Sequence, residues 1–145
     1  MMRGGAAMKI LVTEVEPDDG RTVGALLAVR GHDVDFCHPP GSTGWPCAGL
    51  APGGCCPLTD GGADVVVDVR IAGGPPSARE MGAACAVAAG TPLIIAGRAP
   101  EGTALAERAT LVCAPDAVES ACAGMSDVRL ATRDEGPRQE SPRAP

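Results

Sequence analysis

The segment that most constrains the fold is a nearly continuous run of valines between Val65 and Val69, interrupted only at Asp68. A strand with one face in water alternates apolar and polar residues, whereas a strand buried on both faces is apolar throughout. Strands of the second kind belong to parallel sheets that helices cover on both sides. The run therefore predicts a central strand over residues 63–70.

Strand-like and helix-like segments alternate along residues 8–125. Short aliphatic runs predict strands, and apolar residues at helical spacing predict helices between them. The expected strands are 8–13, 33–37, 63–70, 92–96 and 110–113, and the expected helices are 21–30, 77–89, 101–109 and 115–124. This alternation implies a parallel sheet with right-handed crossovers. We expect one three-layer α/β domain, Rossmann-like and flavodoxin-like, with a five-stranded parallel sheet in the order 2-1-3-4-5.

Short motifs at the helix ends support these boundaries. Asp18 or Asp19 can cap the helix that begins at residue 21. Ser77 and Glu80 have the spacing of a capping box. Gly90 stands where a glycine in the left-handed conformation commonly ends a helix.

Glycine and proline, 20 and 14 residues respectively, are concentrated outside these elements. Residues 38–63 are rich in Cys, Gly and Pro and show no periodicity, so they predict a long loop. Loops of this length are usually functional or disordered. Residues 1–7 and 126–145 are expected to be a disordered extension and a disordered tail, because the tail combines many charges and prolines with few apolar residues.

Charge and aromatic content exclude some classes of function. The net charge is −6, and the chain has one Phe, one Trp and no Tyr. Nucleic-acid binding is not expected, because it needs basic surfaces and often aromatic side chains that stack on bases. The apolar runs are too short to span a bilayer, so we expect a cytoplasmic protein that binds no membrane. The partner, protein or small molecule, stays open, and the Ala-rich segment 117–124 allows a homodimer.

The predicted carboxyl ends of the strands carry most of the candidate binding residues. In open α/β sheets ligands bind at this edge. The first turn lacks the glycine pattern of dinucleotide sites and is acidic, with Glu14 and Glu16 as candidate ligands for Mg²⁺. The alternative interpretation is a solvated turn with capping residues.

One arginine ends the third predicted strand, and another follows the fourth. Arg70 and Arg98, together with nearby glycines, could hold a phosphate or carboxylate. The alternative is that the glycines serve only the tight turns. Asp68 would then be a strand-end carboxylate that pairs with Arg70 or Arg98.

Cysteines are frequent for a chain of this size, with seven in total. Cys37, His38, Cys47, Cys55 and Cys56 fall within twenty residues and are candidates for a Zn²⁺ or Fe–S site or for thiol redox chemistry. Their spacing matches no short metal knuckle, and incidental cysteines in a glycine-rich loop are the alternative. The remaining three, Cys85, Cys113 and Cys122, are expected to be small buried apolar residues.

The segments 10–17, 31–34 and 64–68 resemble the receiver domains of response regulators. The resemblance implies a CheY-like fold in which Glu14 takes a Mg²⁺-binding position and Asp68 the phosphoacceptor position. The chain departs from the family pattern at Val15, where the main metal-binding acid is expected. It also departs at Gly97, where a Ser or Thr is expected, and it has no Lys near Cys113. The resemblance thus implies the fold and a degenerate site.

A second resemblance is carried by segments 46–50, 56–58 and 64–70. They are similar to a group of short uncharacterised proteins from high-GC bacteria, which have no assigned activity. This similarity therefore implies no function.

These observations lead to one leading hypothesis and two alternatives. The leading one is a non-catalytic regulatory or ligand-binding α/β domain, a degenerate receiver-like module. The first alternative is a thiol-redox or metal-binding protein that uses the Cys-rich loop. The second is a small enzyme that acts on a phosphate-bearing small molecule. No catalytic residues can be assigned from the sequence.

Overall fold

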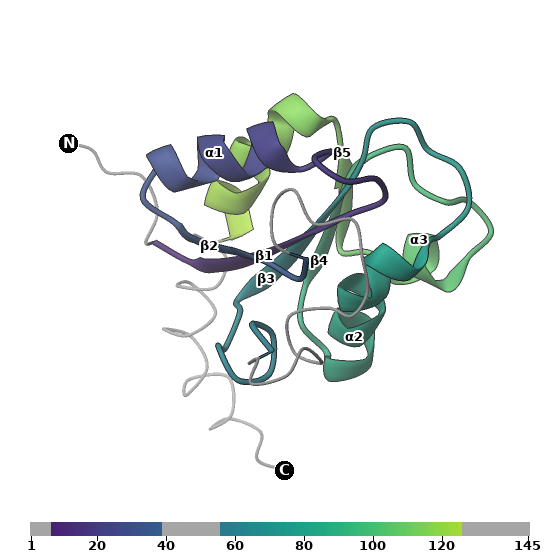
Figure 1. The fold of residues 1–145 in the computed structure, drawn as a ribbon, viewed down its shortest axis with the longest axis horizontal. Coiled ribbons are helices and arrows are strands. Elements are labelled where there is room, and N and C mark those ends of the chain that lie inside the picture. The colour runs from purple at the N-terminus through teal and green to yellow at the C-terminus, as the bar shows by residue number, and fades with distance from the viewer. Residues whose placement is uncertain (1–6, 39–55, 126–145) are drawn as a thin grey trace, which may run out of the picture.

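The computed structural model describes residues 7–38 and 56–125 (Figure 1). Its sheet is five-stranded and parallel, in the order β2-β1-β3-β4-β5. The strands are β1 (Lys9–Glu14), β2 (Asp33–Phe36), β3 (Val65–Arg70), β4 (Leu93–Gly97) and β5 (Leu111–Cys113). The predicted α/β class, strand order and flavodoxin-like topology are confirmed.

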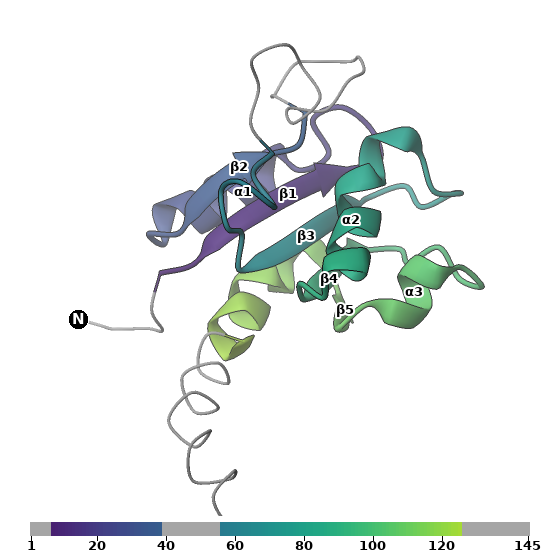
Figure 2. The same cartoon turned by 90° about the horizontal axis from the view of Figure 1, so that it is seen from below.

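Helices cover both faces of the sheet. They are α1 (Arg21–Val29), the 3₁₀ turn η1 (Ala78–Glu80), α2 (Met81–Ala89), α3 (Ala104–Arg108), the 3₁₀ turn η2 (Pro115–Ala117) and a last helix at 118–125. Figure 1 shows α1 and the last helix on one side of the sheet, and Figure 2 shows α2 and α3 together on the other. The chain therefore forms the three layers that the sequence predicted.

Strand β3 is buried at all six positions. Successive side chains of a strand point to opposite faces, so β3 contributes to two apolar clusters. Val65, Val67 and Val69 pack with α1 and the last helix. Val66 packs with α2 on the opposite face. The valine run thus supplies the centre of both layers of core.

The edge strands differ from β3 in burial. In β2 exposed and half-buried positions alternate. In β5 the side chains of Leu111 and Val112 are 39% and 47% exposed. The core is therefore concentrated on β1, β3 and β4.

The start of α1 corrects one sequence prediction. Gly20, rather than Asp18 or Asp19, occupies the N-cap position, so the helix start has no hydrogen bond from an N-cap side chain. The Gly20 N–H donates to Glu14 Oε2 at 2.9 Å. A Cβ at Gly20 would lie 2.7 Å from Val12 Cγ1, so the close approach of the turn to β1 requires a glycine. Asp18 instead turns the chain, with φ of 73°.

Other helix-end predictions are confirmed. Ser77 and Glu80 form a capping box, in which the Ser77 N–H donates to Glu80 Oε1 at 2.7 Å. Gly90 ends α2 in the left-handed conformation, with φ of 79°. The helix predicted over 101–109 is shorter, because Thr103 caps it and Ala109 is already extended.

Several predicted segments lie wholly or partly outside the described residues. These are the extension 1–7 except Ala7, the tail 126–145, and residues 39–55 of the Cys-rich loop. The described end of that loop is held in place: Leu58 is buried, and the Cys56 N–H donates to Asp60 Oδ2 at 3.0 Å. Within the described ranges, no helix has the length and apolar character to cross a membrane.

Replacement of Gly82 by alanine tests how closely α2 approaches the sheet. A Cβ at Gly82 would lie 2.4 Å from Cys37 Sγ and 2.7 Å from Thr13 Cγ2. We expect Gly82→Ala to lower the free energy of unfolding by about 1–3 kcal/mol, the usual cost of overpacking. Urea denaturation measures this change.

Gly124→Ala is the matched control. Gly124 lies in the last helix, and its added Cβ would meet nothing within 4 Å. Alanine should stabilise the helix there by up to about 1 kcal/mol. Equal stability of the two variants would contradict the described packing of α2 against β1.

Candidate functional site

The carboxyl ends of β1, β3 and β4 meet at one edge of the sheet. Thr13 pairs with Asp68, and Arg70 pairs with Gly97, in the parallel register. This register brings Glu14, Asp68 and Arg70 to the same edge, as the sequence predicted. It gives them different environments, however, and those environments decide what each residue can do.

Arg70 is completely buried, with 0% of its surface exposed. Its Nη1 donates to Glu80 Oε2 in a buried ion pair, and its Nη2 donates to the Gly74 carbonyl. Its Nε donates to the Arg98 carbonyl at 2.7 Å. All three guanidinium nitrogens therefore have partners within the protein. Arg70 connects two loops and a helix start, and none of its surface is exposed.

Gly97 lets the β4 end approach Arg70 closely. Its φ is 120°, and a Cβ there would lie 2.1 Å from the Arg70 carbonyl oxygen. The next residue, Arg98, donates its N–H to that same carbonyl at 2.9 Å. Any other residue at 97 would push this contact apart. The glycine that the receiver pattern would replace by Ser or Thr thus has a structural role.

Asp68 is buried beside Glu80. It is 0% exposed, and its Oδ1 accepts a 2.7 Å hydrogen bond from Thr13 Oγ1. Burial, together with the hydrogen bond and negative charge of Glu80, raises the pKa of Asp68 to about 8, although Thr13 and Arg70 oppose the shift. Asp68 therefore carries a proton near neutral pH. The expected pairing with Arg70 or Arg98 is not the arrangement found, because Arg70 pairs with Glu80.

Glu14 is also used within the protein. It is 3% exposed, accepts from Arg79 Nη2 at 3.1 Å and holds the Gly20 N–H. Glu16, the second acidic candidate, is exposed. In residues 7–38 and 56–125, no group of three or more His, Cys, Asp or Glu side chains could hold a metal ion. Glu14 thus has a structural role, because it links β1 to the start of α1 and to Arg79.

Arg98 is exposed and lines a pocket of about 500 Å³. Its walls are the loop after β3 and the loop after β4, with Ala72, Gly73, Gly74, Pro75, Pro76, Arg98, Ala99, Pro100, Glu101 and Thr103. As far as the described chain extends, the N–H groups of Gly73 and Gly74 donate to no protein acceptor. Arg98 and the two glycines therefore line the same pocket, and Glu101 is also on its wall.

Sequence reasoning missed Arg79 and only partly identified Glu80. Glu80 was visible as a capping residue, but its ion pair with Arg70 spans elements that are joined only in the fold. Arg79 has no local signal, since its partner Glu14 is 65 residues away. The two arginines that the sequence analysis paired as a candidate anion site have different locations in the fold. Arg70 is in the interior, and Arg98 is on the pocket wall.

The cysteines occupy three kinds of environment. Cys37 is buried and Cys56 half-buried, and both belong to the cluster around Leu58. Cys122 is buried and Cys113 half-buried on the opposite face, whereas Cys85 is exposed. The prediction that Cys85 is a buried apolar residue is wrong, because it lies on the solvent side of α2. Cys47 and Cys55 fall outside the described residues, and His38 is buried next to Cys37.

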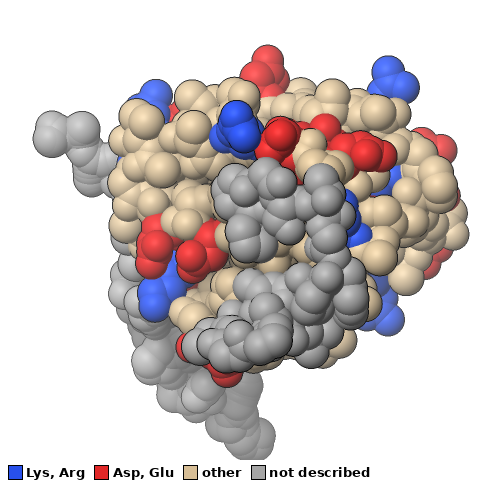
Figure 3. Space-filling model, in the orientation of Figure 1, with Lys and Arg blue, Asp and Glu red and all other residues tan. Residues whose placement is uncertain are grey.

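Surface charge agrees with the expectation from composition. On the face that Figure 3 shows, Lys and Arg stand singly among Asp and Glu, with no broad basic area over the described residues. The sequence as a whole carries 12 basic and 18 acidic residues.

The chain matches no protein-family model and no curated protein sequence.

Replacement of Asp68 by asparagine tests its protonation. A carboxyl whose pKa rises on folding stabilises the protein below the unfolded pKa of 3.8, and this contribution is lost as pH rises toward about 8. Asparagine mimics the protonated form. We expect the free energy of unfolding of the wild type to fall over this window, by at most about 1.4 kcal/mol per pH unit from Asp68.

Denaturation from pH 4 to 8 measures the slope, which Asp68→Asn should reduce. Asp35→Asn, at an exposed position on β2, is the control and should keep the wild-type slope. The same slope in Asp68→Asn and wild type would contradict a protonated Asp68.

Thiol reactivity tests the cysteine environments. Hydrogen bonds from Thr59 and Leu58 lower the pKa of Cys56 even though burial opposes them, whereas burial raises the pKa of Cys122 to about 11. Because the thiolate is the reactive form, iodoacetamide should modify Cys56 faster than Cys122 in the native protein. Peptide mapping by mass spectrometry measures both rates. In urea, where both thiols are exposed, the two cysteines should react at equal rates, and this serves as the reference. Equal rates in the native protein as well would contradict the different environments of Cys56 and Cys122.

Proposed function

We propose that residues 8–125 form a non-catalytic, receiver-like domain that binds a small anion. The binding site is the pocket between the loop after β3 and the loop after β4. The observation that carries the proposal is that one pocket of about 500 Å³ is lined by the exposed Arg98 and by Gly73 and Gly74, whose N–H groups have no protein acceptor within the described part of the chain. Guanidinium and backbone N–H groups are the usual donors to phosphate and carboxylate.

The environment of Asp68 supports a non-catalytic role. A phosphoacceptor has to be ionised and within reach of a phosphodonor. Asp68 has no exposed surface, and its pKa of about 8 keeps it protonated near neutral pH. Phosphotransfer to Asp68 would require this buried carboxyl to become exposed first.

The use of Arg70 inside the protein further favours binding over phosphate chemistry. An enzyme acting on a phosphate would profit from two converging arginines, but the three guanidinium nitrogens of Arg70 are already bonded to Glu80, Gly74 and Arg98. Arg70 instead fixes the two loops that form the pocket. A single exposed arginine suits recognition of an anion.

Substitution of Arg98 tests the proposed site. Inorganic phosphate added to ¹⁵N-labelled protein should shift the amide resonances of Gly73 and Gly74. Arg98→Gln should weaken phosphate binding about tenfold or more, because a hydrogen bond to a charged group contributes about 1.5–3 kcal/mol. NMR titration yields both dissociation constants.

Two further variants make this titration specific. Arg21→Gln removes an exposed arginine on α1 and should leave phosphate affinity unchanged. Glu101→Gln removes the opposing charge on the pocket wall and should strengthen phosphate binding. Absence of phosphate-induced shifts at Gly73 and Gly74 would overturn the proposal.

A further inference from the structure

The pocket lined by Arg98, hereafter the anion pocket, adjoins an apolar groove. This groove lies between α2 and α3, has a volume of about 550 Å³, and shares Pro76 and Thr103 with the anion pocket. Ligand sites commonly have volumes of ~300–1,000 Å³, so each half is large enough for a small ligand. The two shared residues place the groove and the anion pocket side by side.

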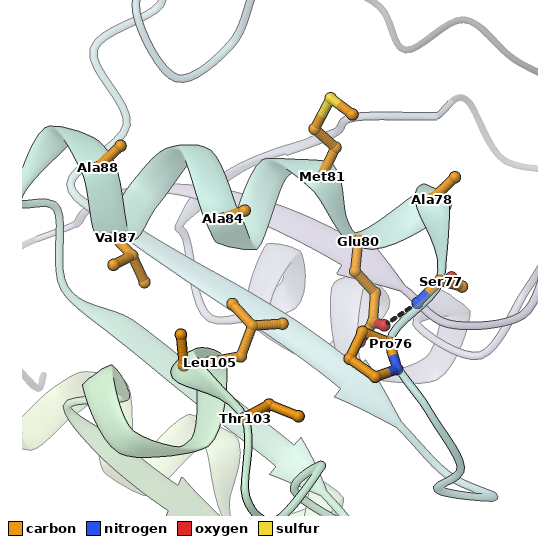
Figure 4. A pocket seen from close by; sticks show the side chains of 11 residues that line it. Pro76, Ser77, Ala78, Glu80, Met81, Ala84, Val87, Ala88, Thr103 and Leu105 are labelled. Atoms are coloured by element: carbon orange, nitrogen blue, oxygen red, sulfur yellow. Dashed lines mark hydrogen bonds between the residues drawn. The ribbon is translucent and has the colours of Figure 1, made fainter.

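Small and aliphatic side chains form most of the groove. Figure 4 shows Val87 of α2 and Leu105 of α3 pointing toward one another, with Ala84 beside them. Thr103 and Pro76 lie at the end near Glu80. Alanine on α2 leaves open the space that a larger residue would fill.

Charge is confined to one end of this combined site. Among the described residues that line the groove, Glu80 is the one ionisable residue. Both of its oxygens are bonded within the protein, Oε1 to the Ser77 N–H and Oε2 to Arg70. The described lining of the groove therefore offers no free charge to a ligand, whereas Arg98 lines the adjoining pocket.

We propose that the ligand is an anionic amphiphile, a phosphate or carboxylate with a short alkyl tail. This inference rests on the proposed function, because its head group occupies the same anion pocket. The head lies against Arg98 and the glycine N–H groups, and the tail passes Pro76 and Thr103 into the groove between α2 and α3. Charge complementarity at one end and apolar walls at the other fix this orientation.

Comparison of hexyl phosphate with inorganic phosphate tests the tail separately from the head. Each methylene buried in the groove adds favourable transfer free energy, so hexyl phosphate should bind about tenfold tighter or more. NMR titration below the micellar concentration gives both dissociation constants. Arg98→Gln should weaken both ligands.

Filling the groove should remove only the contribution of the tail. Ala84→Phe is expected to abolish the gain of hexyl phosphate while phosphate binds as in wild type. Ala89→Phe places the same side chain at an exposed position of α2 outside the groove and should retain the gain. The amide spectrum of each variant reports whether the fold is intact.

Each outcome decides between the two proposals. Phosphate binding with no gain from the hexyl tail overturns the amphiphile and leaves the anion site standing. If neither phosphate nor hexyl phosphate binds to the wild-type protein, the proposed function itself is overturned. A gain that survives Ala84→Phe places the tail elsewhere and also overturns the inference. A concentration-dependent dimer that Ala84→Phe disrupts would identify the groove as a contact between copies and overturn it too.

Discussion

The buried ion pair between Arg70 and Glu80 determines the shape of the whole strand-end region. Removing an arginine from water is costly unless every donor finds a partner. Arg70 meets this condition by bonding to Glu80, to the Gly74 carbonyl and to the Arg98 carbonyl. The start of α2 and both loops that line the pocket are therefore positioned by their hydrogen bonds to one buried guanidinium group.

The same constraint explains the state of Asp68. Asp68, Arg70 and Glu80 are all buried at this edge, and three ionised groups would leave one negative charge without a partner. The raised pKa of Asp68 removes that charge, so one cation faces one anion. A residue that resembles a phosphoacceptor in the sequence is thus a neutral part of the core.

The parts of the fold set by local pattern could be predicted, and the parts set by distant pairing could not. The valine run identified β3 as a central strand, and the Ser77–Glu80 spacing identified the helix start, because both depend on neighbours in sequence. The cap of α1 was mispredicted since Glu14 reaches Gly20 across a turn. Of the two candidate arginines, sequence spacing could not show which one would be buried, because the partners of Arg70 become neighbours only when the sheet forms.

The two bonds between Arg70 and Arg98 have a consequence for recognition. The Arg98 N–H donates to the Arg70 carbonyl, and the Arg98 carbonyl accepts from Arg70 Nε. A residue whose backbone N–H and C=O groups are both held in this way has little freedom to rotate or shift. The conformational entropy of this pocket wall is therefore lost during folding, before any ligand arrives. A preorganised wall lowers the entropic cost of association, which lets even a small molecule with few contacts bind measurably.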